Sequence, residues 1–136
     1  RSQHFGSRDA MRRGAWAIIR DAGPLTALAL EGDRALGEVW ERAARKQWPQ
    51  VVVLKTGARG WREAMMTPSQ LNLGSAKLKA LAEALAREAW RAHGTGSGPT
   101  ALRHDAAEAV LLGLWALRQL ARARANPAAD AEGEPM

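Results

Sequence analysis

The stretch that decides the fold is residues 25–54, which read LTALALEGDRALGEVWERAARKQWPQVVVL. Residues 25–30 form a short apolar run without helical periodicity, and residues 51–54 are apolar and mostly β-branched, so both are predicted to be buried strands. Between them, Asp33 can cap a helix that runs to about Lys46. A strand, a helix and a strand joined by short connections predict a right-handed parallel crossover, and therefore an α/β fold.

The rest of the chain is predicted to be largely helical. Apolar residues at helical spacing predict a helix over residues 7–22, a short helical turn over 61–66, a long helix over 75–92 and a last helix over about 103–124. Two parallel strands alone make a poor sheet, because both faces and both edges need cover. We therefore expect these strands to lie in the middle of a larger sheet, whose first strands would precede residue 1.

Composition favours one basic domain over residues 1–125. The chain has 136 residues and a net charge of +6, and removing the three acids of the Ala- and Pro-rich tail, residues 126–136, leaves +9 on the remainder. The tail is predicted to be disordered. A basic body suits a polyanionic partner, although solubility alone is an alternative reason for the charge. The absence of cysteine excludes disulfides and thiolate zinc sites, and no apolar run is long enough to span a membrane.

Two groups of acidic residues could carry chemistry. Glu31 directly follows the first predicted strand, and the carboxyl ends of parallel strands are where open α/β sheets place their ligands; a simple turn residue is the alternative. Asp105 and Glu108 share one helix face and continue the apolar stripe of Leu112 and Trp115. Carboxylates on a core-facing stripe need a partner, and a divalent metal is a natural one. A capping box at the helix start is the competing interpretation.

Acids from a strand and from a distant helix are what metal-dependent phosphodiester hydrolysis requires. Two Mg²⁺ ions about 4 Å apart activate water and stabilise the leaving oxygen, and acids from a single helix cannot surround both ions. His104, next to Asp105, could act as a ligand or in proton transfer, or it could be an ordinary surface residue.

Basic residues fall where phosphates could be held, at helix starts and in loops after strands. Trp61 lies between Arg59 and Arg62, and it could stack on an unpaired base or anchor the core. For Lys77 and Lys79, solvated helix charge is an equal alternative. The candidate DNA-binding residues are Lys55, Arg59, Trp61, Arg62, Lys77 and Lys79. Four other tryptophans lie on apolar helical stripes and are expected in the core: Trp16, Trp40, Trp90 and Trp115.

The order of these features resembles the RuvC-like Holliday-junction resolvases of the RNase H-like superfamily, including the chloroplast branch. Leu28-Ala29-Leu30-Glu31 is similar to the family strand that ends in a Glu, and Asp105-Ala106-Ala107-Glu108-Ala109 is similar to its last helix. The resemblance spans roughly residues 25–117. In two respects the sequence departs from the family pattern: Glu108 stands where Asp is more usual, and no first-strand Asp is found.

The resemblance implies an RNase H-like, RuvC-type mixed sheet flanked by helices, in a homodimeric endonuclease that cuts four-way DNA junctions. It implies that Mg²⁺, which Mn²⁺ can replace, is held by Glu31, Asp105 and Glu108, with His104 assisting catalysis. Three alternatives stay open. They are a non-catalytic DNA-binding module with a degenerate site, another RNase H-like nuclease, and a helical protein-interaction domain in which the acids merely cap a helix.

Overall fold

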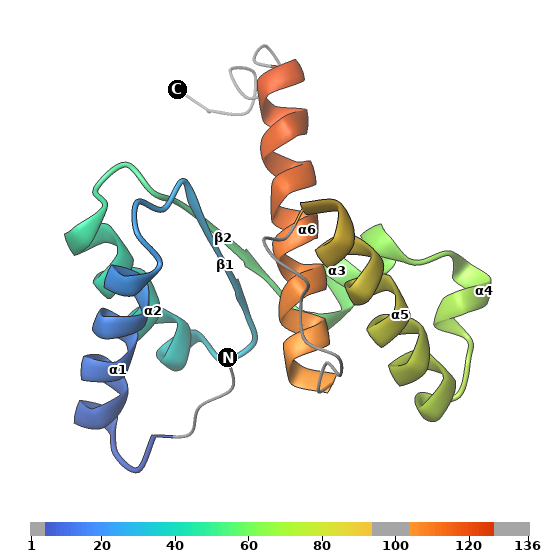
Figure 1. Cartoon of the computed structure of the whole chain (residues 1–136), viewed down its shortest axis with the longest axis horizontal. Helices are drawn as coiled ribbons and strands as arrows, with labels where there is room; N and C mark the ends of the chain where they lie inside the picture. The colour runs from blue at the N-terminus through green and yellow to red at the C-terminus, as the bar shows by residue number, and fades with distance from the viewer. Residues whose placement is uncertain (1–4, 94–103, 127–136) are drawn as a thin grey trace, which may run out of the picture.

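The computed structural model of the chain describes residues 5–93 and 104–126, the side chains of His104 and Asp105 excepted. The fold is mixed α/β, mostly helical, with a small parallel sheet (Figure 1). Its elements in order are α1 (Arg8–Asp21), β1 (Ala27–Glu31), α2 (Arg34–Gln47), β2 (Val52–Thr56), α3 (Ala58–Met65), α4 (Pro68–Leu71), α5 (Ser75–His93) and α6 (His104–Ala125). The predicted tail lies, from residue 127 on, outside the described residues.

The predicted strand–helix–strand order and the parallel pairing are confirmed, but the two strands, predicted to be buried, are only partly buried. β1 and β2 pair in parallel, with Ala27 opposite Val52 and Glu31 opposite Thr56. Gly32 turns the chain after β1 with a φ of 95°, a conformation that side chains rarely adopt. Asp33 then caps α2, because its Oδ1 accepts hydrogen bonds from the backbone N–H groups of Ala35 and Leu36. β1 begins two residues later than predicted and includes Glu31, so this carboxylate belongs to the strand itself.

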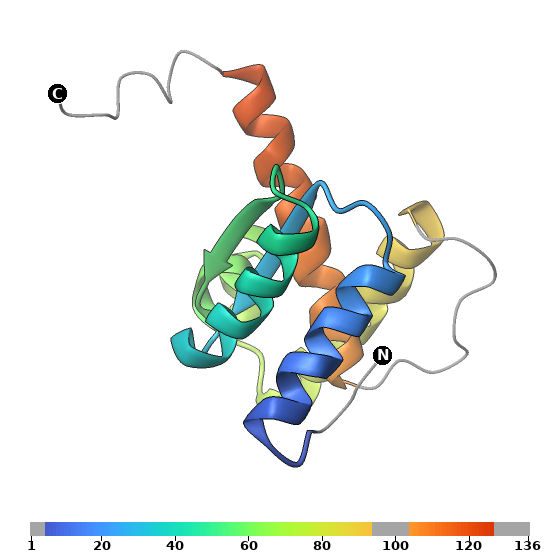
Figure 2. The ribbon, with the colours of Figure 1, turned by 90° about the vertical axis from the view of Figure 1, so that its left-hand side faces the viewer.

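The first core cluster lies between α1, α2 and the sheet. Its buried residues are Ala15, Ile19, Ala43, Ala44 and Val51. Three of these five are alanines, which let the two helices approach closely, and Figure 2 shows α1 and α2 side by side. The apolar face of the strands covers this cluster through Leu28 and Val53. The helical periodicity predicts most of these buried faces, but Leu36, expected on the inner face of α2, is 51% exposed.

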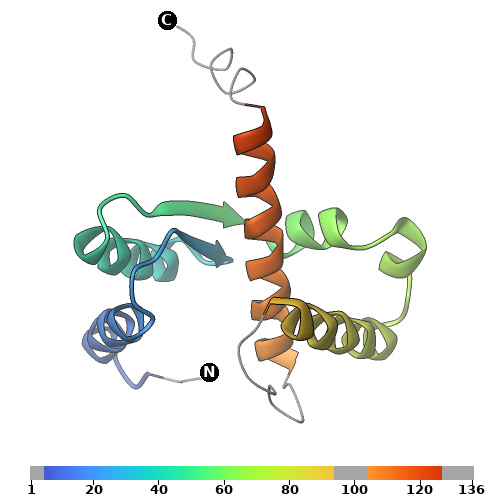
Figure 3. The ribbon, with the colours of Figure 1, turned by 45° about the horizontal axis from the view of Figure 1, so that its top comes forward.

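The second core cluster joins α3, α5 and α6. Its buried residues are Trp61, Met66, Ala82, Ala86, Ala107 and Leu111. Again alanines on α5 and α6 allow close helix packing, and Trp61 fills the space beside them. Figure 3 shows α6 standing between the part formed by α1, α2 and the strands and the part formed by α3, α4 and α5. α6 contacts β1, α3 and α5, so it connects the two clusters.

Three features differ from the expectation. The predicted turn over residues 61–66 is the second half of α3, which starts at Ala58, and a further short helix, α4, follows it. A capping box between Thr67 and Gln70, with Pro68 in the first turn, accounts for α4. Trp16 was expected in the core but is 41% exposed, because the stripe that α1 buries runs through Ala15 and Ile19 instead.

The sheet leaves room beside β1. Among the described residues, each strand has one hydrogen-bonded neighbour, so each also has an open edge. A groove of about 500 Å³ lies between β1 and α6, lined by Ala27 and Ala29 of the strand and by Leu117 and Leu120 of the helix. Leu117 is 53% exposed there. Unpaired strand edges and exposed apolar side chains are features that folded domains normally cover.

A pair of leucines on α6 tests this account of the core. Leu111 is fully buried in the second cluster, whereas Leu117 lines the open groove. Leu111→Ala is expected to lower the free energy of unfolding by about 3 kcal/mol, because it leaves a cavity between packed helices. Leu117→Ala removes the same atoms and should change the free energy of unfolding by less than about 0.5 kcal/mol. Urea denaturation followed by circular dichroism measures both values, and equal losses would contradict the assignment.

Candidate functional site

Glu31 and Trp61 form the first contact of the candidate site. Nε1 of Trp61 donates a hydrogen bond of 2.7 Å to Oε2 of Glu31 at the end of β1. The Trp61 ring is fully buried in the core of α3, α5 and α6. A buried indole N–H needs an acceptor, and the Glu31 carboxylate supplies it. The hydrogen bond therefore fixes the Glu31 side chain against the start of α3.

Arg62 and Glu108 form the second contact. The Arg62 guanidinium makes an ion pair with the Glu108 carboxylate of α6, and it also lies over the Trp61 ring, 5.4 Å from the ring centroid. The Arg62 side chain is 37% exposed and that of Glu108 21% exposed, so the pair is partly shielded from water. An ion pair with reduced solvent access is stronger than one on the open surface.

Through these two contacts, Glu31 and Glu108 of the predicted acidic site are bound by neighbouring residues of α3. Glu31 from β1 and Glu108 from α6 bind to Trp61 and Arg62, which are consecutive in α3. Asp105 lies three residues before Glu108 in α6, a spacing that places both on the same helix face. The side chains of Asp105 and of its neighbour His104 lie outside the described residues, and no group of three potential metal ligands occurs among the side chains that are described.

Glu31 also lines a cleft at the carboxyl edge of the sheet. The cleft has a volume of about 320 Å³ and lies between the end of β1, the start of α2 and the end of β2. Its charged lining residues are Glu31, Asp33, Arg34 and Lys55. This is the edge at which parallel sheets bind ligands, because the crossover connections diverge there. The Asp33 carboxylate caps the start of α2. Glu31 is the other carboxylate that lines the cleft, and it caps no helix.

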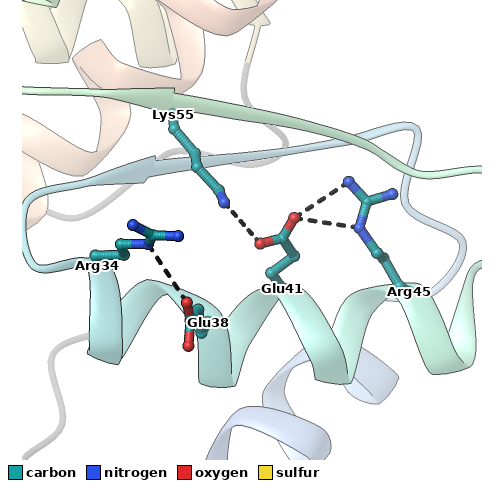
Figure 4. Close-up of polar contacts among 5 residues, drawn as sticks. All are labelled: Arg34, Glu38, Glu41, Arg45 and Lys55. Atoms are coloured by element: carbon teal, nitrogen blue, oxygen red, sulfur yellow. Dashed lines mark hydrogen bonds and ion pairs between the residues drawn. The ribbon is translucent and has the colours of Figure 1, made fainter.

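Lys55 is held by a carboxylate of α2. Its Nζ lies 2.8 Å from Oε2 of Glu41, and Arg45 contacts the other Glu41 oxygen at 3.2 Å (Figure 4). Hydrogen bonding to Lys55 is the main cause that lowers the pKa of Glu41, with Arg45 adding to it against a partial desolvation. The Lys55 charge is thus shared between the cleft and the α2 surface.

The other candidate phosphate-binding residues are spread over the molecule. Arg59 is almost fully exposed and pairs with Glu63 one turn later in α3 at 2.9 Å. Lys77 and Lys79 are exposed on the first turns of α5, a helix that packs mainly against α6.

Trp61 has the core role that its sequence left open as an alternative. Because its ring is fully buried, it offers no face for stacking on a base. Arg62 was predicted as a phosphate ligand, and its pairing with Glu108 joins two elements far apart in the sequence, a contact that no local pattern indicates. Trp61 and Arg62 are therefore residues that position the two glutamates.

The Glu41 cluster gives a pH-dependent stability. The folded-state pKa of Glu41 lies below its unfolded value, so its ion pairs stabilise the fold above the unfolded pKa and lose this effect as the pH falls through the folded pKa. We expect Glu41→Gln to lower the free energy of unfolding at pH 7 and to have little effect at pH 2. Glu38→Gln, which disrupts only an exposed pair with Arg34 at 3.5 Å, is the control. Urea titrations over this pH range measure the difference; a Glu41→Gln effect that is constant with pH would refute it.

Comparisons with known proteins add no family to these observations. No family model matches the chain, and no curated protein or solved structure matches it either. Within the described parts of the chain, no helix is both long enough and apolar enough to span a membrane.

Proposed function

We propose that this chain carries the acidic site of an RNase H-like nuclease of the RuvC-like resolvase class. In this proposal the protein is a homodimeric, structure-selective endodeoxyribonuclease that nicks four-way DNA junctions with Mg²⁺, or with Mn²⁺ in its place. The observation that carries the proposal is the attachment of Glu31 and Glu108, from β1 and α6, to the consecutive residues Trp61 and Arg62.

The donor chemistry of this corner fits a magnesium site. Carboxylate oxygens are the ligands that Mg²⁺ prefers, and Glu31, Asp105 and Glu108 would supply them from two elements. Glu108 already binds a cation, the Arg62 guanidinium, which supports a local potential that attracts positive charge. When bound, the metal ions supply an activated water and neutralise the charge on the leaving oxygen. Trp61 and Arg62 would orient the carboxylates, and His104 would assist in proton transfer, as the family resemblance implies.

The finer fold in this proposal includes at least one further strand along the open edge of β1. The family pattern places its first Asp on such a strand. The groove of about 500 Å³ beside β1 and its apolar lining support this arrangement, because a strand there would pair the open edge and cover Leu117. β1 would then become an interior strand, as its apolar composition predicts.

A second candidate is a non-catalytic DNA-binding module with a degenerate site. The ion pair between Arg62 and Glu108 favours it, because the guanidinium provides the positive charge that a metal ion would otherwise provide. The module would bind DNA through its basic surface, in a salt-sensitive manner, and cleave nothing in either Mg²⁺ or Mn²⁺.

Glu31→Gln tests the catalytic assignment in the intact protein. The variant keeps an oxygen that can accept the Trp61 hydrogen bond, so the fold should persist, but it loses the charge that a metal ligand needs. We expect nicking of a labelled four-way junction in Mg²⁺ to fall by about 100-fold, with junction affinity in Ca²⁺ unchanged. The cleavage products are measured on denaturing gels.

Glu88→Gln makes the same chemical change on the exposed surface of α5, outside both proposed sites, and should cut at the wild-type rate. If Glu31→Gln cuts as fast as the wild type, the site assignment is wrong. If the wild type binds junctions but does not cut them in either metal, the non-catalytic module is the correct function. Unlabelled duplex and DNA–RNA hybrid competitors distinguish a junction resolvase from another RNase H-like nuclease.

A further inference from the structure

A second groove lies between α1 and α2, away from the acidic corner. It has a volume of about 480 Å³, and the two helices that form its walls run side by side in Figure 2. We call it the α1–α2 groove. Four cationic residues line it: Arg8, Arg12, Arg42 and Lys46.

The charge of this groove is strongly one-sided. The carboxylate that lines it, Glu38, lies 3.5 Å from Arg34, and Arg12 has a loose contact of 3.6 Å with Asp9. In each helix the lining cations are four residues apart, Arg8 with Arg12 and Arg42 with Lys46. Like charges at this spacing destabilise a helix. Fold stability therefore does not explain them, whereas a polyanionic partner does.

An exposed aromatic ring lies among these cations. Trp16 follows Arg12 by one helical turn, lines the groove and is 41% exposed. Gln47 at the end of α2 donates a hydrogen bond of 3.0 Å to the Trp16 carbonyl oxygen, which fixes this part of α1 against α2. An exposed indole beside four cations combines the two features that bind single-stranded nucleic acid, which are base stacking and phosphate neutralisation.

The spacing of the cations also suits a nucleic-acid backbone. Residues four apart in a helix are about 6 Å apart along its axis, which is close to the separation of neighbouring phosphates. Two such pairs on facing helices can contact successive phosphates from both sides of one strand. A rigid duplex presents its bases inside the stack, where Trp16 cannot reach them, so the exposed ring selects an unpaired segment.

We propose that the α1–α2 groove binds a single-stranded nucleic-acid segment, with Arg8, Arg12, Arg42 and Lys46 on the phosphates and Trp16 stacked on a base. This binding site is independent of the acidic corner and of any metal ion. It does not depend on the proposed nuclease function, and it would serve either that nuclease or the non-catalytic module.

The test measures binding without metal. Fluorescence anisotropy with a labelled oligothymidylate is recorded in EDTA over a range of KCl concentrations. The triple variant Arg12→Gln, Arg42→Gln, Lys46→Gln should bind about 10-fold more weakly, and the slope of log K against log salt should fall by about 2 in magnitude, because three phosphate contacts are lost. Trp16→Ala should weaken binding by about 10-fold, whereas Trp16→Phe should retain most of the affinity.

A matched control removes three exposed cations elsewhere. The variant Arg87→Gln, Arg91→Gln, Arg122→Gln changes the net charge equally on α5 and α6 and should bind like the wild type. An equal loss of affinity in both triple variants would overturn the proposal, because net charge alone would then explain binding. An unchanged affinity for Trp16→Ala, or a preference for duplex of the same length, would also overturn it. Glu31→Gln should bind normally here, so failure of the nuclease proposal is recognised separately.

Discussion

The hydrogen bond from the Trp61 indole to Glu31 joins α3 to the end of β1, and together with the packing of α6 it holds the two core clusters against each other. The Trp61 ring belongs to the core of α3, α5 and α6, while its N–H is satisfied at the end of β1. A buried donor without a partner costs about 1–3 kcal/mol, so the strand end and α3 are held together. Trp48 and Trp90 differ from Trp61, because their buried Nε1 atoms have no hydrogen-bond partner in the described part of the chain.

Local patterns predicted the crossover, and long-range contacts explain what they missed. The β1–α2–β2 unit follows from two apolar runs and from Asp33, whose capping role depends on the next few residues alone. Trp16 was predicted to be buried from its apolar character, but Arg8 and Arg12 share its helix face, and α1 buries Ala15 and Ile19 instead. The pairing of Arg62 with Glu108 likewise depends on where α6 crosses α3.

The basic charge of the chain has several different structural roles. Lys55 and Arg45 pair with Glu41, and Arg59 pairs with Glu63, so these cations largely stabilise the α2 and α3 surfaces. The cations of the α1–α2 groove are in a different situation, because they outnumber the carboxylates around them. The repeated four-residue spacing of these cations was present in the sequence, but without the packing of α1 on α2 there was no indication that the two pairs face one groove. The local balance of cations and carboxylates is therefore a better indicator of a polyanionic partner than the net charge of the whole chain.

Arg62 is the residue that relates the two functional candidates. A partly shielded carboxylate needs a cation, and the Arg62 guanidinium provides it for Glu108. A nuclease must exchange this guanidinium for a metal ion, and the 37% exposure of Arg62 leaves its side chain free to swing toward solvent or toward a phosphate. A non-catalytic module keeps the ion pair as a structural link between α3 and α6. In the nuclease, the ion pair therefore holds Glu108 in position to bind a metal ion. In the non-catalytic module, Arg62 permanently replaces the metal ion.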